Sequence, residues 1–138
     1  MTAQAIAPRA TRLGEVKATI NWESVAAITT GTSKARRYIP YYCRILDVIV
    51  NSGTAGSGGT SDIIDINIGG TTIFTTQGNR PTLLVGDTGS FSVSGLGVTT
   101  WIPEVVTMVP GDILTYDIDQ ICTTGSALFT ITILLGAR

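Results

Sequence analysis

The clearest pattern in this chain is the stretch Asp62-Ile-Ile-Asp-Ile-Asn-Ile-Gly-Gly-Thr-Thr-Ile-Phe74. Isoleucine occupies every second position from 64 to 68, and alternate residues of a strand lie on the same face. Asp65 and Asn67 therefore lie on the opposite face. The Gly69-Gly70 pair that follows suits a tight turn, because hairpin turns require positive φ angles. The stretch predicts a β-hairpin with one apolar and one polar face.

Similar strand patterns occur along most of the chain, separated by Gly- and Pro-containing turns. Ile45–Val50, Ile113–Ile121 and Leu128–Leu135 all alternate apolar residues with period two. Val16–Ile20 is a short candidate strand, and Ser24–Thr30 is another that could instead begin with a helical turn. No long amphipathic helix is indicated. About eight strands at this spacing predict an all-β, antiparallel, jelly-roll-like sandwich with an extended N-terminal arm.

The composition indicates a single domain with few charges. The 138 residues can bury a real core, and only 14% are charged, against about 25% in an ordinary soluble domain. No apolar run approaches the roughly 20 residues of a membrane helix, and the N-terminus lacks the pattern of a signal peptide. We therefore expect no membrane partner. A charge-poor soluble chain also suggests that much of its surface is covered by other subunits.

Charge is divided unevenly along the sequence. Residues 1–44 contain seven basic and two acidic residues, whereas residues 45–138 contain two basic and eight acidic residues. The uneven distribution could be chance, or the basic segment could dock on acidic protein. Nucleic acid is a weaker option, because the basic residues are dispersed and the acidic part would repel phosphate. We therefore expect no nucleic-acid partner. Strand-forming residues become frequent from Tyr38 onward, so we divide the chain into an arm, residues 1–37, and a sandwich domain, residues 38–138.

The expected arm supplies the candidate partner-binding residues. Gly31–Arg37 is expected to be a loop within it. Trp22 is either an anchor for a partner pocket, since Trp is frequent among interface hot spots, or part of the packing of the arm. The residues expected to bind a partner are Arg9, Arg12, Leu13, Lys17, Ile20, Trp22, Lys34, Arg36 and Arg37.

The residue inventory argues against an enzyme. The sequence has no histidine, which removes the commonest general base and most zinc sites. Asp65, Asp117 and Asp119 occupy the alternating positions expected for outward-facing polar residues. Calcium binding by Asp62 with Asp65, or by Asp117 with Asp119, is a minor alternative because neither pair has the ligand density of an EF-hand. We therefore expect no catalytic site, no metal site and no cofactor.

Two further features leave alternatives open. The segment Ser52–Ser61 contains only Gly, Ser, Thr and Ala. It is either a plain surface loop or a loop that adapts to a neighbouring subunit or a glycan. Cys43 and Cys122 are expected to be buried and reduced, and a disulfide would require their strands to be neighbours.

Several motifs together resemble a known group of proteins. They are Val48-Ile-Val-Asn-Ser-Gly-Thr-Ala-Gly-Ser-Gly58, Asp65-Ile-Asn-Ile-Gly-Gly-Thr-Thr-Ile-Phe-Thr-Thr76, Asn79-Arg-Pro-Thr82, Pro110-Gly-Asp-Ile-Leu-Thr-Tyr-Asp-Ile-Asp-Gln-Ile121 and Leu128-Phe-Thr-Ile-Thr-Ile133. Their succession, over about residues 40–138, resembles a jelly-roll module of tailed-bacteriophage virion proteins. Such modules occur in capsid decoration (cement) proteins and in tail-fibre or receptor-binding tips, commonly as trimers.

The resemblance implies a function of a mechanical kind. The chain would be a homotrimeric decoration protein on the outer capsid surface, made in the host bacterial cytoplasm and bound to the major capsid protein. Its arms would link neighbouring capsomers. The alternative is a tail-fibre tip module that recognises a host surface glycan, although a fibre protein normally has a long shaft as well.

Overall fold

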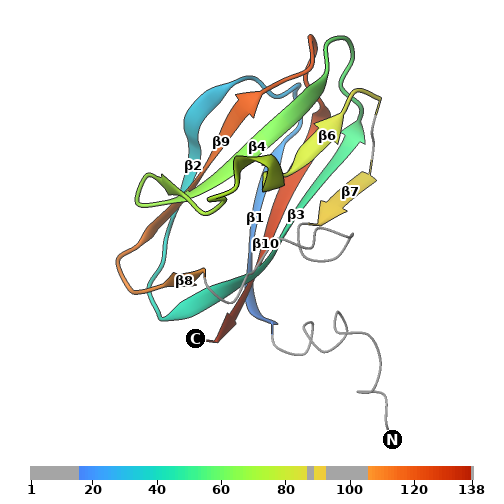
Figure 1. Ribbon diagram of the computed structural model, residues 1–138. Helices are drawn as coiled ribbons and strands as arrows, with labels where there is room; N and C mark the ends of the chain where they lie inside the picture. The colour runs from blue at the N-terminus through green and yellow to red at the C-terminus, as the bar shows by residue number, and fades with distance from the viewer. Residues whose placement is uncertain (1–15, 87–88, 93–105, 138) are drawn as a thin grey trace, which may run out of the picture.

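The structure is a computed structural model that describes residues 16–86, 89–92 and 106–137. Two antiparallel five-stranded sheets face each other as a sandwich (Figure 1). The first sheet contains β1 (Val16–Ser24), β10 (Ala127–Ala137), β3 (Cys43–Thr54), β7 (Gly89–Ser92) and β8 (Thr107–Met108). The second contains β2 (Gly31–Tyr38), β9 (Ile113–Gln120), β4 (Ser61–Ile68), β5 (Thr71–Thr72) and β6 (Thr82–Leu84). The predicted all-β sandwich is confirmed.

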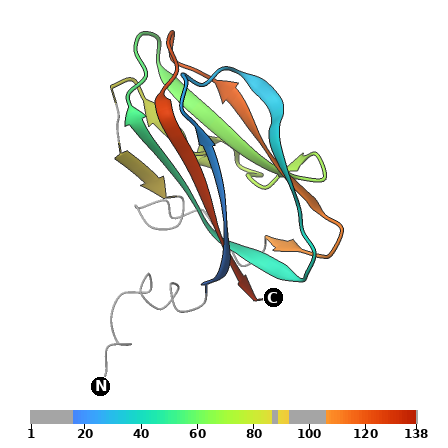
Figure 2. The same cartoon turned by 180° about the vertical axis from the view of Figure 1, so that it is seen from behind.

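The strands pair in a nested order. β1 pairs with β10, β2 with β9, β3 with β7 and β8, and β4 with β5 and β6. β10 also pairs with β3, and β9 with β4, which places these two late strands inside their sheets. This order is that of a jelly roll, in which early strands pair with late ones and successive long strands alternate between sheets. Figure 2 shows β10 between β1 and β3 from behind.

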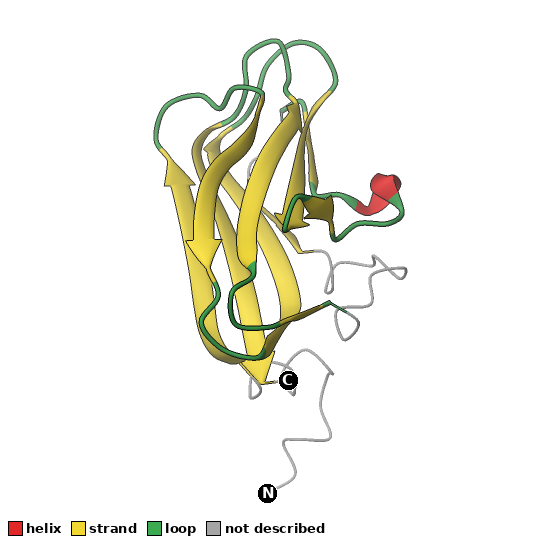
Figure 3. Cartoon of the chain, turned by 90° about the vertical axis from the view of Figure 1, so that its left-hand side faces the viewer, coloured by secondary structure: helices red, strands yellow, loops and turns green. Residues whose placement is uncertain are grey.

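The core lies between the sheets and follows the period-two pattern of the sequence. Ile64 and Ile66 of β4 are completely buried, as are Ile131 and Ile133 of β10. The predicted hairpin after β4 is also present, and Gly69 and Gly70 have φ angles of 59° and 85°. A short helical turn, Gln77–Asn79, projects from one side of the sandwich (Figure 3).

The prediction of an N-terminal arm is wrong for residues 16–37, the part of the expected arm that the structure describes. Val16–Ser24 is β1 and pairs with β10, and Gly31–Tyr38 is β2 and pairs with β9. The sandwich therefore begins at residue 16 instead of residue 38, and each sheet takes its first strand from the segment expected to be an arm. Residues 25–30, which connect the two strands, contain neither helix nor strand.

The error at β2 has a physical cause. The burial of β2 does not alternate, because only Gly31 and Ala35 are partly buried and the six other residues are exposed. A bulge between Gly31 and Ala35 also breaks its register against β9. Almost all side chains of β2 lie outside the core, so its sequence lacks the apolar alternation by which strands with a buried face are identified.

Candidate interaction surface

The exposed basic residues of the expected arm lie on the edge strand β2. Lys34, Arg36 and Arg37 are all exposed. Arg36 is opposite Thr115 of β9, whose neighbours Leu114 and Tyr116 face the core, so Arg36 lies on the outer face of the sheet. These three residues form a basic edge.

The bulge in β2 fixes the position of Lys34. Ser33 has a φ of 47°, a left-handed conformation that is uncommon for a residue other than glycine. Its backbone N–H donates to Oδ1 of Asp117 at 2.7 Å, which holds the bulge against β9. The Nζ of Lys34 then donates to Oγ1 of Thr29 at 3.0 Å. The first cation of the edge is therefore oriented by a local hydrogen-bond network.

Three tyrosines extend the basic edge around one end of the sandwich. Tyr38, Tyr41 and Tyr42 are 58%, 45% and 62% exposed. The turn that carries them is anchored by Ile39, whose N–H donates to Asp112 and whose carbonyl accepts from Gly111. Exposed aromatic side chains on an anchored turn can contact a partner with little loss of conformational entropy. We call Lys34, Arg36, Arg37, Tyr38, Tyr41 and Tyr42 the basic–tyrosine edge.

The other predicted partner-binding residues are distributed differently. Lys17 is exposed on β1, whereas Ile20 and Trp22 of the same strand are 3% and 9% exposed and face the core. The ring of Trp22 lies 5.1 Å from that of Tyr116, centroid to centroid. Ile20 and Trp22 are therefore core residues, and the prediction that they bind a partner is wrong. Arg9, Arg12 and Leu13 lie outside the described residues.

The outer face of the second sheet carries a network of carboxylates and amides. Thr72 donates to Asp65 at 2.6 Å, Asn67 donates to Asp117 at 3.1 Å, and Arg80 forms an ion pair with Asp119 at 2.6 Å. Burial raises the pKa of Asp65, and the nearby charge of Asp119 adds to the effect, while the hydrogen bond from Thr72 opposes it. In the described part of the chain, no group of three or more acidic or cysteine side chains could hold a metal ion.

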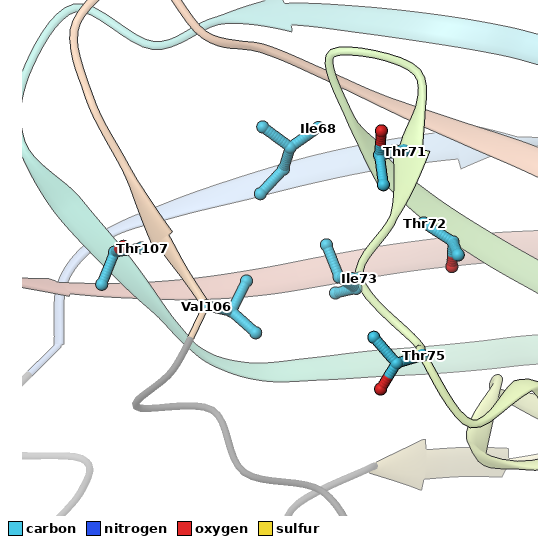
Figure 4. Close-up of a pocket in the computed structure, with 7 residues that line it drawn as sticks. All are labelled: Ile68, Thr71, Thr72, Ile73, Thr75, Val106 and Thr107. Atoms are coloured by element: carbon cyan, nitrogen blue, oxygen red, sulfur yellow. The ribbon is translucent and has the colours of Figure 1, made fainter.

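A cavity of about 350 Å³ lies between the β4–β5 hairpin and the strand β8 (Figure 4). Its lining is made of aliphatic side chains and threonines, without a titratable group that could act as an acid, a base or a metal ligand. The cavity is suited to an apolar side chain more than to catalysis. The lining residues are Ile68, Thr71, Thr72, Ile73, Thr75, Val106 and Thr107.

The glycine-rich segment after β3 is a packed connection. Ser57 exchanges backbone hydrogen bonds of 2.9 and 2.8 Å with Thr124, and Thr123 donates to the carbonyl of Gly58 at 2.9 Å. A Cβ atom at Gly56 would lie 2.7 Å from the Sγ of Cys122, so a side chain there would collide with this cysteine. The small residues thus allow the loop to approach the β9–β10 connection closely.

The two cysteines are both buried and free. Cys43 begins the 12-residue strand β3, whereas Cys122 lies beside Gly56, beyond the other end of that strand. A strand of this length spans about 40 Å, so the two sulfur atoms cannot form a disulfide. Burial raises the pKa of both thiols, and the charge of Asp62 adds to the effect at Cys122. The prediction that both cysteines are buried is confirmed, and they form no disulfide with each other.

The tyrosines are the residues of the candidate surface that sequence reasoning missed. The segment Arg36-Arg-Tyr-Ile-Pro-Tyr-Tyr-Cys-Arg44 contains three tyrosines and three arginines within nine residues. Tyrosine and arginine are both enriched in protein interfaces, so this local composition was the available signal. The segment crosses the boundary expected between arm and domain, and in the structure it runs from β2 through the following turn into β3.

Comparison with known proteins identifies no relative. No protein-family model matches the chain, and no match is found among curated proteins. None of the described residues belongs to a helix of the length and apolarity needed to cross a membrane.

Proposed function

We propose that this chain is a capsid decoration protein of a tailed bacteriophage, which binds the outer capsid surface and links neighbouring capsomers. The jelly-roll order of the strands supports the proposal, together with the motif resemblance over residues 40–138. The observation that carries it is the basic–tyrosine edge. A decoration protein needs a rigid body with an adhesive surface, and this edge offers cations and aromatic rings on an anchored strand and turn.

The partner expected at this edge is an acidic surface of the major capsid protein. Cations on a protein rim speed association and orient the encounter, although each exposed ion pair contributes only about 0–1 kcal/mol. Buried aromatic anchors contribute more to affinity, and tyrosine is common among them. The basic residues would therefore position the protein, and the tyrosines would hold it in place. Such binding needs neither a catalytic residue nor a cofactor.

Occupancy on purified capsids tests the proposal. We compare the wild-type protein with a charge variant (Lys34→Gln, Arg36→Gln, Arg37→Gln) and a ring variant (Tyr38→Ala, Tyr42→Ala). The charge variant should bind severalfold more weakly at low salt and less so at high salt, because salt screens exposed ion pairs. The ring variant should bind at least tenfold more weakly at both salt concentrations. Arg80→Gln, a charge change at the end of the helical turn Gln77–Asn79 and outside the basic–tyrosine edge, is the control and should bind normally.

Undiminished occupancy by a protein carrying all five substitutions would refute this use of the edge. Labelled electron microscopy of intact particles tests the location independently of the binding surface. A decoration protein covers the shell uniformly. Label confined to the tail tip would reject the capsid location.

The exposed tyrosines also support a second candidate, a tail-fibre tip module that binds a host surface glycan. Tyr38, Tyr41 and Tyr42 present rings to solvent, and aromatic rings are suited to stacking on sugars. In this case the ring variant should lose binding to host polysaccharide, while the charge variant keeps it. A few copies at the tail tip, in place of shell coverage, would favour this candidate.

A further inference from the structure

β1 is a long strand at the edge of its sheet. Its nine residues pair with β10, and among the described residues no strand pairs with its other side. Lys17, Thr19, Asn21 and Glu23 are exposed, in alternation with residues that face the core. An edge strand of this length presents a row of unpaired backbone N–H and C=O groups that can accept another strand.

The other edges of the described sheets are protected or short. β2 has three cations and a bulge, and any antiparallel pairing of β2 with a copy of itself brings cations close together. Like charges on facing strands destabilise pairing. The remaining edge strands β5, β6, β7 and β8 have two to four residues each. Among the described strands, β1 is therefore the long edge that lacks a block of like charge.

The exposed side chains of β1 are complementary to a second copy of the strand. If two copies pair in antiparallel orientation with Ile20 opposite Ile20, Lys17 lies opposite Glu23 of the second copy. Thr19 then lies opposite Asn21 of the second copy, and the two-fold axis repeats both pairs. Opposite residues of an antiparallel pair share a face, so the core-facing residues of the two copies also meet. Shifting the register by two residues in either direction removes the Lys17–Glu23 pairing.

We propose that a second copy of this chain docks on β1 by this antiparallel pairing. The first sheets of the two copies then form one continuous sheet across the contact. The bulge of β1 lies between Val16 and Ala18 and contains Lys17, whereas Ala18 to Ser24 are regular. The regular residues would supply the backbone pairing, and Lys17 would approach Glu23 of the second copy from the bulged end of the strand. A two-fold contact of this kind closes at a dimer. The proposal thus predicts a dimer in place of the homotrimer implied by the resemblance to virion jelly-roll modules, and it does not depend on the function proposed for β2.

Charge reversal at the two ends of β1 gives a direct test by sedimentation equilibrium. Wild-type protein should have twice the mass of the 14.5 kDa chain. Lys17→Glu places glutamates opposite glutamates, and Glu23→Lys places lysines opposite lysines. Each single variant should dimerise about tenfold or more weakly, because two attractive pairs per dimer become repulsive.

The mixture of the two single variants provides the decisive observation. In a mixed dimer, Glu at position 17 of one copy faces Lys at position 23 of the other, and the second pair is the unchanged Lys17 with Glu23. The mixture should therefore form dimers at concentrations where each variant alone is mostly monomeric, and the double variant should dimerise again by itself. Circular dichroism verifies that each variant is folded, which is expected because both positions are exposed.

Matched controls come from an ion pair on the other sheet. Arg80→Glu and Asp119→Lys change the charge by the same amounts at an exposed pair away from β1, and both should leave the dimer intact. A monomeric or trimeric wild-type protein would overturn the proposal. Equal dimerisation of the wild-type protein and both β1 variants would overturn it as well, because the contact would then lie elsewhere.

Discussion

The carboxyl group of Asp62 joins segments that lie far apart in the sequence. It is completely buried at the start of β4 and accepts hydrogen bonds from the backbone N–H of Cys122 at 2.8 Å and of Ser126 at 3.2 Å. The hydroxyl of Ser126 also donates to it. These bonds fasten the β9–β10 connection onto the second sheet. The sequence allows Asp62 as a calcium ligand, but in the structure both of its carboxylate oxygens accept hydrogen bonds from the protein.

Replacing Asp62 by alanine should lower the free energy of unfolding by about 2–4 kcal/mol, because three buried donors lose their acceptor. Urea denaturation measures the loss. Asp119→Ala is the control and should cost less than about 1 kcal/mol, since its ion pair with Arg80 is partly exposed. A loss at Asp62 no larger than that of the control would contradict this role.

The raised pKa of Asp65 gives a pH dependence with a definite sign. The folded protein holds the proton of Asp65 to a higher pH than the unfolded chain, which releases it near pH 4. Between the pKa of Asp65 in the unfolded chain and its higher pKa in the folded protein, the folded state binds more protons. The contribution of Asp65 to stability therefore falls as pH rises through this range. Asparagine does not titrate, so Asp65→Asn lacks this pH-dependent contribution. The stability of the variant relative to wild type should therefore increase as pH rises from about 4.

Denaturation of both proteins across pH 3.5–7 measures that difference. Thr72→Val should widen the pH range over which the stability contribution of Asp65 falls, because the hydrogen bond from Thr72 lowers the pKa of Asp65. A stability difference between wild type and Asp65→Asn that is constant with pH would show that Asp65 titrates alike in the folded and unfolded chains.

Substitutions on the two faces of β1 should affect the stability of the fold differently. Its inner face places Trp22 against Tyr116 of the opposite sheet, and its outer face presents exposed polar residues. Trp22→Ala should therefore destabilise the fold itself, by about 3–5 kcal/mol, as expected for removing a large aromatic side chain from a core. Thr19→Ala, on the outer face of the same strand, should change stability by less than about 1 kcal/mol. Thermal unfolding followed by circular dichroism compares them, and similar melting temperatures would place Trp22 outside the core.

The predictability of each element from the sequence follows from how much of it is buried. In β4, β9 and β10 the residues that face the other sheet are apolar and alternate with mostly polar residues, and these strands were predicted correctly. β2 was not, because six of its eight residues are exposed and so need not alternate with apolar residues. The partners of Trp22 were also not predictable, since Tyr116 lies 94 positions away in the sequence. Of the candidate surface, the cations were predicted and the tyrosines were not.

The nested pairing makes the whole molecule depend on its first and last strands together. β10 lies between β1 and β3, so the first sheet cannot be completed before the end of the chain is available. Contacts of such long sequence separation slow folding, typically to milliseconds or seconds for all-β domains. We therefore expect folding to require residues 16–37, which were assigned to an arm from the sequence.

Deletion of residues 1–37 should abolish cooperative folding, because it removes β1 and nearly all of β2 and leaves β10 and β9 as unpaired edges. Deletion of residues 1–15 keeps every described strand and should preserve a cooperative transition. Thermal unfolding distinguishes these outcomes. A cooperative transition in the shorter protein that starts at residue 38 would restore the original view of a separate arm.

The pairing of Val16 with Gly136 has a practical consequence for protein engineering. Paired residues of antiparallel strands have Cα atoms about 5 Å apart, so the chain enters and leaves the sandwich at neighbouring points. Figure 1 shows that β10 ends at the end of the sandwich where β1 begins. The sandwich can thus be inserted as a guest domain into a surface loop of a host enzyme without forcing the loop ends apart. The host activity would then report on the folding of the guest in living cells.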